Sequence, residues 1–312
     1  MRKFSWVLLL VMSLLLAACG NEGEAEETSE DTKEPKKEVT VTHKLGDTTL
    51  EKNPEKVVVF DFGTLDTLNE LGVEIAGVPK DSLPSYLSKY EGEAYAHVGG
   101  LKEPDFEKIY EVGPDLIVIY GRQMDQYEKF AEIAPTIFVE LDAENYMESF
   151  KGNVEMLANI FDKKEEAEEK LATIEKNVEN LKEQTSGSEG LIILSTGGKV
   201  SAYGEGSRFG IIHDTFGVQA VDESIEVATH GQNVSFEYIL EQNPGYLFVI
   251  DRDAVVNDEP VAKQTVENEL VKQTTAYEKN QIVYLDPNYW YLSGGGLQSV
   301  QAMIDEIEAS MN

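Results

Sequence analysis

Arginine is rare in this 312-residue sequence, and its positions suggest chemistry. The chain has four arginines: Arg2, Arg122, Arg208 and Arg252. Lysine supplies almost every other cation, whereas arginine offers a planar fork of N–H donors that fits catecholate, carboxylate or phosphate oxygens. We therefore expect Arg122, Arg208 and Arg252 to bind an anion. The alternative is that Arg122 and Arg252 are buried ion-pair partners, with Asp251 and Asp253 as candidate acids.

Two of these arginines end the copies of an internal repeat. Residues 105–122 align with residues 235–252 at a constant offset of 130 positions, without a gap. Six pairs are identical: Phe106 and Phe236, Glu107 and Glu237, Ile109 and Ile239, Glu111 and Glu241, Pro114 and Pro244, and Arg122 and Arg252. Each copy predicts a short helix, a turn marked by proline and a buried strand that carries the arginine at its carboxyl end. Such a repeat indicates two half-proteins of related structure.

The elements around the repeat alternate between strand and helix, which is typical of βαβ units and a mainly parallel sheet. A hairpin is expected around Gly46, and strands are expected at 56–60, 75–78, 116–120, 137–138, 191–194, 247–250 and 282–285. Helices are expected through Leu65, Leu68 and Leu71 and near 207–216, 264–277 and 297–310. Two α/β lobes leave a cleft between them, and ligands of such sheets lie outside the carboxyl ends of the strands. Both repeat arginines have that position.

The segment between the two halves is a long amphipathic stretch. From residue 146 to residue 182 there is no proline and one glycine, Gly152. Apolar residues recur at steps of three and four, which predicts one helix of about nine or ten turns. The alternative is a helical hairpin broken near 162–164. We expect an α/β lobe over 39–145, a linking long helix over 146–186 and a second α/β lobe over 187–312.

The amino-terminal residues have the features of a secretory signal over 1–18: a basic start, a short apolar run and small residues before a cleavage point. The sequence Leu16-Ala17-Ala18-Cys19 is similar to a lipobox, at which bacteria attach diacylglycerol to the cysteine. Cys19, the only cysteine, is therefore expected to carry a lipid anchor. Residues 19–38 are acidic and contain no aromatic residue, so we expect a flexible tether. The alternative is an ordinary signal peptide with an incidental cysteine.

The formal net charge of −32 argues against nucleic acid as a partner, because no basic stripe is present to neutralise phosphates. An anionic ligand would have to be recognised by local contacts rather than by long-range attraction. The four histidines, His43, His97, His213 and His230, are too scattered to suggest a three-histidine metal site. No nucleophile elbow, Walker loop or dinucleotide fingerprint is found, so we expect neither enzyme activity nor an intrinsic cofactor.

From Val39 onward, the residues described above resemble the ferric-siderophore-binding lipoproteins of ABC importers, and most closely the catecholate branch that receives enterobactin-like and petrobactin-like ligands. The resemblance implies an α/β fold of two Rossmann-like lobes bridged by one long α-helix, like that of class III periplasmic binding proteins. It also implies capture of an iron(III)–siderophore complex in the cleft and delivery to an ABC permease dimer with its ATPase. The protein would be a monomer on the extracytoplasmic side of the cell membrane, held there only by its lipid anchor.

The same resemblance gives roles to single residues. Arg122, Arg208 and Arg252 match three arginines that line the cleft against the ferric complex. His230 and Tyr291 match a histidine and a tyrosine that coordinate iron in some relatives when the siderophore leaves positions open. Otherwise His230 is a surface loop residue and Tyr291 packs in the cleft. Some relatives place a lysine one turn beyond the first arginine, where this chain has Asp125, so the pattern does not identify the siderophore.

The last implied site is a docking surface. Glu107 and Glu237 match glutamates that relatives present, one per lobe, to arginines on the two halves of the permease. The alternative is that both are ordinary glutamates in the first turn of a helix, where the helix dipole favours them.

A haem-binding or cobalamin-binding lipoprotein of the same fold is the alternative function. Haem could use His230 or Tyr291 without needing three arginines, and cobalamin needs no anion clamp.

Overall fold

The computed structural model describes residues 37–228 and 230–311. The expected signal sequence, Cys19 and nearly all of the expected tether lie outside the described residues. The described chain begins almost at once with an antiparallel hairpin of β1 (Glu38–His43) and β2 (Gly46–Glu51), as the sequence predicts.

The first lobe is built on a five-stranded parallel sheet with the order β5-β4-β3-β6-β7. The central strands β3 and β6 are fully apolar and buried, as expected for a sheet covered on both faces. The strands are β3 (Val57–Val59), β4 (Gly77–Val78), β5 (Ala96–His97), β6 (Leu116–Ile119) and β7 (Thr136–Phe138). The helical segments are α1 (Phe62–Glu70), η1 (Ser85–Glu91), α2 (Phe106–Val112), η2 (Gly121–Gln126) and α3 (Tyr127–Ala131).

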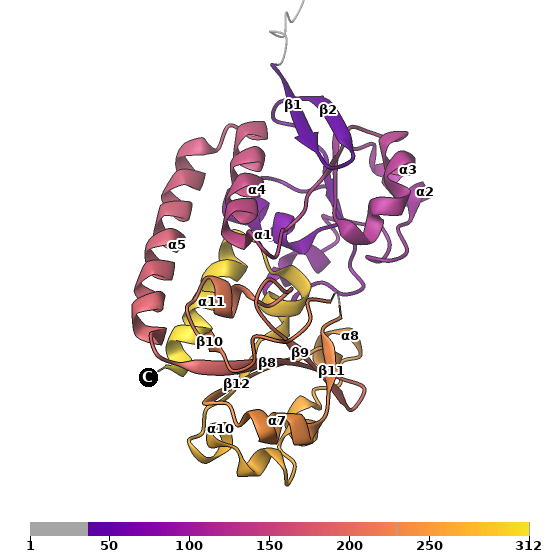
Figure 1. Ribbon diagram of the computed structural model, residues 1–312. Helices are drawn as coiled ribbons and strands as arrows, with labels where there is room; N and C mark the ends of the chain where they lie inside the picture. Colours follow the sequence, from indigo (N-terminus) through magenta and orange to yellow (C-terminus); the bar gives the residue numbers. More distant parts are fainter. Residues whose placement is uncertain (1–36, 229, 312) are drawn as a thin grey trace, which may run out of the picture. The chain divides into compact units, whose positions relative to one another are not determined.

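The expected single helix over 146–182 is wrong, and the helical hairpin is what the structure shows. The two helices are α4 (Tyr146–Ile160) and α5 (Lys164–Thr185), which lie side by side (Figure 1). The chain reverses at Asp162, whose φ of 51° is left-handed. Its carboxylate accepts hydrogen bonds from Lys52 Nζ and Asn53 Nδ2, both at 2.8 Å, so the break is fixed by the loop after β2. The expected linking helix over 146–186 is therefore reduced to α5.

The second lobe has a mixed sheet with the order β11-β9-β8-β12-β13, and β10 pairs with β8. Strands β10, β8, β12 and β13 are parallel, while β9 and β11 run antiparallel to their neighbours. The strands are β8 (Glu189–Thr196), β9 (Lys199–Tyr203), β10 (Gln219–Ala220), β11 (Gln232–Val234), β12 (Tyr246–Asp251) and β13 (Ile282–Leu285).

The helices of the second lobe are mostly short. They are α6 (Ile211–Asp214), α7 (Phe236–Gln242), α8 (Asp253–Val256), α9 (Ala262–Val266), η3 (Val271–Gln273), α10 (Thr275–Glu278), the π-helical turn η4 (Asn288–Ser293) and α11 (Leu297–Ser310). The helix expected near 264–277 is divided among α9, η3 and α10, and the one expected near 207–216 is only one turn. The helix expected at 297–310 is confirmed as α11.

The repeat in the sequence is a repeat in the structure. Helix α2 begins at the N-cap Asp105 and leads into β6, and α7 begins at the N-cap Ser235 and leads into β12. Both helices end at a left-handed residue, Gly113 in the first copy and Asn243 in the second. Two α/β lobes related in this way, with α5 as the long helix between them, confirm the expected fold class.

Helix α11 ties the second lobe back to the first, since it packs against both α5 and α1. Its first turn is capped by Asp66 of α1, which accepts hydrogen bonds from Gln298 N at 2.8 Å and Ser299 N at 2.7 Å. The residue at the N-cap position is Gly296, where a Cβ would clash with the Asp66 carboxyl group. No helix in the part of the chain that the structure describes is long and apolar enough to cross a bilayer.

Candidate ligand-binding cleft

A cavity of about 1150 Å³ lies between the two lobes. Its walls come from the carboxyl ends of β3 and β6 in the first lobe and from β8, β9, β12 and η4 in the second. All five residues expected to bind ligand line this cavity: Arg122, Arg208, His230, Arg252 and Tyr291. The residues brought together are separated by up to 169 positions in the sequence, so the cleft is a product of the two-lobed fold.

Tyr291 contacts both arginines that the second lobe contributes to the cavity. Its hydroxyl accepts a hydrogen bond from Arg252 Nε at 2.9 Å, and its backbone carbonyl accepts one from an Arg208 guanidinium nitrogen at 2.6 Å. The Arg208 guanidinium also lies 4.4 Å from the centroid of the Tyr291 ring, a cation–π contact. One tyrosine therefore orients two of the three arginines.

The two guanidinium groups also change the acidity of Tyr291. Burial of the phenol favours its neutral form, but the hydrogen bond from Arg252 and the positive charges of Arg208 and Arg252 outweigh burial. The pKa of Tyr291 is consequently lowered from its ordinary value. A phenol with a lowered pKa, held among cations at a cavity wall, is suited to meet a hard, highly charged ion such as iron(III).

Arg122 stands apart from the other two arginines. It lies on η2, directly after β6, and its side chain is exposed. Among residues 37–228 and 230–311, no side chain or carbonyl forms a hydrogen bond or ion pair with it. The ion-pair alternative is therefore wrong for Arg122. For Arg252 it is partly right, because Asp253 Oδ1 lies 3.7 Å from a guanidinium nitrogen.

The charge of Arg122 still acts on its neighbours in the first lobe. Burial raises the pKa of Asp61, and the Arg122 charge opposes that rise. Burial raises the pKa of Tyr120, which also responds to Asp61, Arg208 and Arg122. Tyr120 thus experiences arginines from both lobes, which indicates that these arginines face a common space.

His230 lines the cavity from the loop before β11, and its side chain is exposed. The following residue, Gly231, has a φ of 69°, and a Cβ there would lie 2.7 Å from the Tyr203 ring. Glycine is therefore required for the loop to pass so close to β9. This close approach brings His230 to the cavity rather than leaving it on a remote surface.

Several residues that line the cavity were not predicted from the sequence. Asp61, Lys102, Tyr120 and Tyr146 all line the cavity from the first lobe. The hydroxyl of Tyr146 is buried and has no hydrogen-bond partner among the described residues. Only Tyr120 had an available signal, since it precedes Gly121 and Arg122 at the end of the repeat strand.

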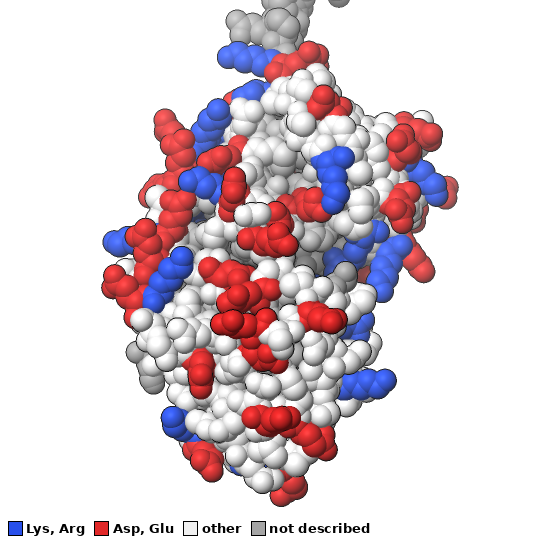
Figure 2. Space-filling model, viewed as in Figure 1, with Lys and Arg blue, Asp and Glu red and all other residues white. Residues whose placement is uncertain are grey.

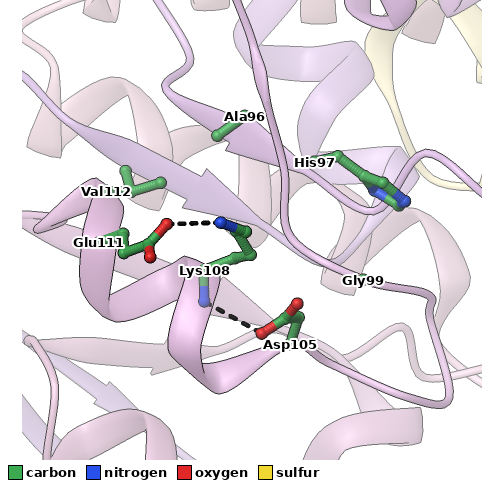
Figure 3. Close-up of a pocket in the computed structure, with 7 residues that line it drawn as sticks. All are labelled: Ala96, His97, Gly99, Asp105, Lys108, Glu111 and Val112. Atoms are coloured by element: carbon green, nitrogen blue, oxygen red, sulfur yellow. Dashed lines mark hydrogen bonds and ion pairs between the residues drawn. The ribbon is translucent and has the colours of Figure 1, made fainter.

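A second cavity, of about 470 Å³, lies in the first lobe between β5 and α2 (Figure 3). None of the expected ligand residues lines it. Lys108 Nζ forms an ion pair with Glu111 at 2.6 Å, and its backbone N–H donates to the N-cap Asp105 (Figure 3). The polar side chains that α2 contributes to this cavity are therefore paired with α2 itself, while His97 contacts Asp81 at 3.3 Å.

Glu107 and Glu237 occupy equivalent exposed positions in the first turns of α2 and α7. Each helix leads into a parallel strand and so begins near the sheet edge where the strands end, on the side of the cleft. A hydrogen bond from its own backbone N–H and one from Ser235 lower the pKa of Glu237. Figure 2 shows acidic side chains spread over both lobes, with a few basic ones gathered at the right between them.

Comparison with known proteins agrees with this architecture. A family model described as periplasmic binding protein matches residues 57–289. The petrobactin-binding protein YclQ of Bacillus subtilis is 47% identical over 99% of this chain and 98% of its own. Its crystal structure has a TM-score of 0.87 and covers 89% of this chain and 99% of the solved one.

A second solved structure, the catecholate-siderophore-binding protein VctP of Vibrio cholerae, is 38% identical. It has a TM-score of 0.83 and covers 88% of this chain and 100% of its own. The ferric-anguibactin-binding protein FatB of Vibrio anguillarum is 32% identical over 86% of each chain. The family match and these relatives show that the chain belongs to the periplasmic binding protein family.

Proposed function

We propose that the protein captures an iron(III)–siderophore complex of the catecholate type in the cleft between its lobes and delivers it to an ABC permease. The observation that carries this proposal is the arrangement of Arg122, Arg208 and Arg252 around one cavity. A ferric tris-catecholate carries about three negative charges, and three guanidinium groups match both its charge and its oxygen acceptors. The relatives that bind petrobactin and catecholate siderophores support the same ligand class.

The charge of the whole protein requires that an anionic ligand be held by local contacts. With a net charge of −32, the protein as a whole repels an anionic ligand at long range. The free energy of binding must therefore come from contacts inside the cavity, where solvent and salt screen charges less. Arg122 is suited to this role because no acid among the described residues forms an ion pair with it.

His230 and Tyr291 are proposed iron ligands for complexes in which the siderophore supplies only four donors. Both line the cavity, and the lowered pKa of Tyr291 favours the phenolate that iron(III) prefers. With a hexadentate siderophore the two side chains contact the complex without entering the coordination sphere.

The cellular setting forms the remaining part of the proposal. The protein is an extracytoplasmic monomer without an intrinsic cofactor or enzyme activity, attached to the membrane through lipidated Cys19. It docks on a permease dimer with its ATPase through Glu107 and Glu237, one from each lobe. One relative described as a putative ABC transporter substrate-binding lipoprotein and another described as a probable siderophore-binding lipoprotein support this setting.

Titration of tryptophan fluorescence tests the ligand class. Trp290 is the only tryptophan besides Trp6, and it is one of the residues that line the cavity. Iron(III)–enterobactin should quench it at low concentration, whereas haem, cobalamin and a neutral ferric hydroxamate should require far higher concentrations.

Single replacements of Arg122, Arg208 and Arg252 by alanine test the role of the arginines. Each should weaken ferric catecholate binding by about 1–3 kcal/mol, or about 5- to 150-fold in Kd, because a charge-assisted hydrogen bond is lost. Tight binding of haem or cobalamin, or normal ferric catecholate binding by all three variants, would refute the proposal.

A further inference from the structure

We infer that Gln123 and Asp253, the two residues that directly follow the repeat arginines, are positioning residues that hold Arg122 and Arg252 in place for the ligand. The inference rests on the proposed function and adds two residues to it. Each side chain is almost fully buried, with 1% of Gln123 and 4% of Asp253 exposed. Neither lines the cavity, so both act through their neighbours.

Asp253 holds Arg252 through a threonine. Arg252 donates to Thr196 Oγ1 at 3.2 Å, and the same hydroxyl donates to Asp253 Oδ1 at 3.1 Å. The second carboxylate oxygen accepts from Gly197 N at 2.6 Å, which fixes the tight turn between β8 and β9. The guanidinium is thus linked to a buried, fully engaged carboxylate rather than left free to rotate.

Gln123 holds Arg122 through the backbone. Its side-chain carbonyl accepts from Tyr120 N at 3.3 Å, while its own N–H donates to Tyr120 O at 2.9 Å. These two bonds close a ring around the turn that carries Arg122. Its side-chain amide also donates to the carbonyl of Leu101, the residue before Lys102 in the cavity wall. The turn is thereby fastened to the neighbouring loop of the same wall.

The two residues occupy the same position of the 130-residue repeat but differ in charge. The difference matches what each arginine needs. Arg252 is linked to Asp253 through its side chain, and a carboxylate can compensate part of its charge. Arg122 is anchored through its main chain by a neutral amide, so its guanidinium keeps its full charge for the ligand. Both lobes therefore present an arginine from a turn that is fastened to an adjacent loop.

Asp253→Asn separates positioning from simple charge compensation, because the two predict opposite signs. If Asp253 only neutralised Arg252, removing its charge would strengthen the binding of an anion. If Asp253 positions Arg252, the amide leaves Gly197 N–H or Thr196 without its acceptor, and binding of iron(III)–enterobactin weakens about tenfold. In an Arg252→Ala background, the same change should alter Kd by less than about twofold, since the residue it acts through is gone.

Two further variants and two matched controls complete the experiment. Thr196→Val removes the bridging hydroxyl without changing charge or size and should reproduce the loss. Gln123→Ala should weaken binding about five- to tenfold, and only when Arg122 is present. Asp251→Asn removes an equal charge beside Arg252, but Asp251 accepts from the backbone of Ala254 and Ala262, so Kd should change little. Gln126→Ala on the same turn as Gln123 should also leave Kd unchanged.

Kd from fluorescence titration and Tm are measured for every variant. Unchanged or tighter binding in Asp253→Asn and Thr196→Val overturns the role of Asp253. Losses that persist at full size without the partner arginine overturn positioning for either residue. If the wild-type protein does not bind iron(III)–enterobactin, the proposed function fails and the positioning roles fail with it.

Discussion

Replacing Asp66 by asparagine should make the stability of the protein less dependent on pH between 5 and 7. Asp66 is fully buried and accepts hydrogen bonds from two backbone N–H groups of α11 and from the Tyr86 hydroxyl at 3.0 Å. Burial nevertheless outweighs these bonds and raises its pKa to about 6. The groups that feel its charge in turn are phenols, those of Tyr86, Tyr90 and Tyr146 among them.

The magnitude follows from the difference between the folded and unfolded pKa. Because the folded pKa of Asp66, about 6, lies above the ordinary value of 3.8, the folded state binds the proton more tightly. The contribution to stability is therefore fully present below about pH 4 and is lost as pH rises through 6. Between pH 7 and pH 5 the wild-type protein should gain about 1.3 kcal/mol from this one group. The amide of the Asp66→Asn variant does not titrate, so that variant gains nothing at this position.

Urea unfolding at pH 5, 6 and 7 measures the effect, with Trp290 fluorescence as the signal. The difference in free energy of unfolding between the wild-type protein and Asp66→Asn cancels the contributions of the other carboxylates, which both proteins share. That difference should move by about 1.3 kcal/mol in favour of the wild-type protein as pH falls from 7 to 5. Parallel curves would show that folding leaves the pKa of Asp66 unchanged, and a change of the opposite sign would show that the site stabilises the carboxylate; either result refutes the reasoning.

The remaining predictions concern the cleft and the outer surface. His230→Ala and Tyr291→Phe should weaken binding of a ferric bis-catecholate and shift its charge-transfer absorbance, while a hexadentate complex is nearly unaffected. An unchanged band in both variants would exclude these residues as iron ligands. Glu107→Ala combined with Glu237→Ala should abolish siderophore-dependent growth with little change in ligand affinity or Tm. Normal transport by that double variant, or loss of transport through unfolding, would leave both as ordinary first-turn glutamates.

The repeat carried most of what could be predicted from the sequence. Helix, turn, strand and arginine are predicted by local signals: an N-cap residue, a left-handed end at Gly113 or Asn243, and a strand with a buried apolar centre. Because these signals recur at an offset of 130 positions, they predict two lobes and place Arg122 and Arg252 at the same edge of each sheet. The structure brings Arg208 and Tyr291 to the same cavity.

The helical hairpin shows where periodicity fails. Apolar residues keep their three- and four-residue spacing through Phe161, because both α4 and α5 bury one face. The break at Asp162 depends on Lys52 and Asn53, which are more than 100 positions away. The spacing of apolar residues within the segment cannot predict that long-range contact. The short strands β9 and β11 were missed for a related reason, since each is defined by its pairing partner rather than by a long apolar run.

The residues that hold the cleft arginines in place could not be predicted from the sequence pattern either. Asp253 was considered as an ion-pair partner, but its link to Arg252 through Thr196 requires the turn between β8 and β9 to be in place. Gln123 has no sequence feature that separates it from an ordinary surface glutamine. Their common position in the repeat becomes informative only when both side chains are found buried.

Because Asp66 caps α11, the contacts of the first lobe are complete only after the end of the chain has been synthesised. Its partners Gln298 and Ser299 follow it by 232 and 233 positions, and ribosomes add about 5–20 residues each second. The first lobe therefore waits roughly 10–50 s for the helix that completes it. During that interval the Asp66 carboxylate lacks both of its backbone donors, so the first lobe is less stable than it is in the finished protein. A lobe that gains these contacts only at the end of synthesis suits a chain that must pass unfolded through an export channel, as the proposed extracytoplasmic location requires.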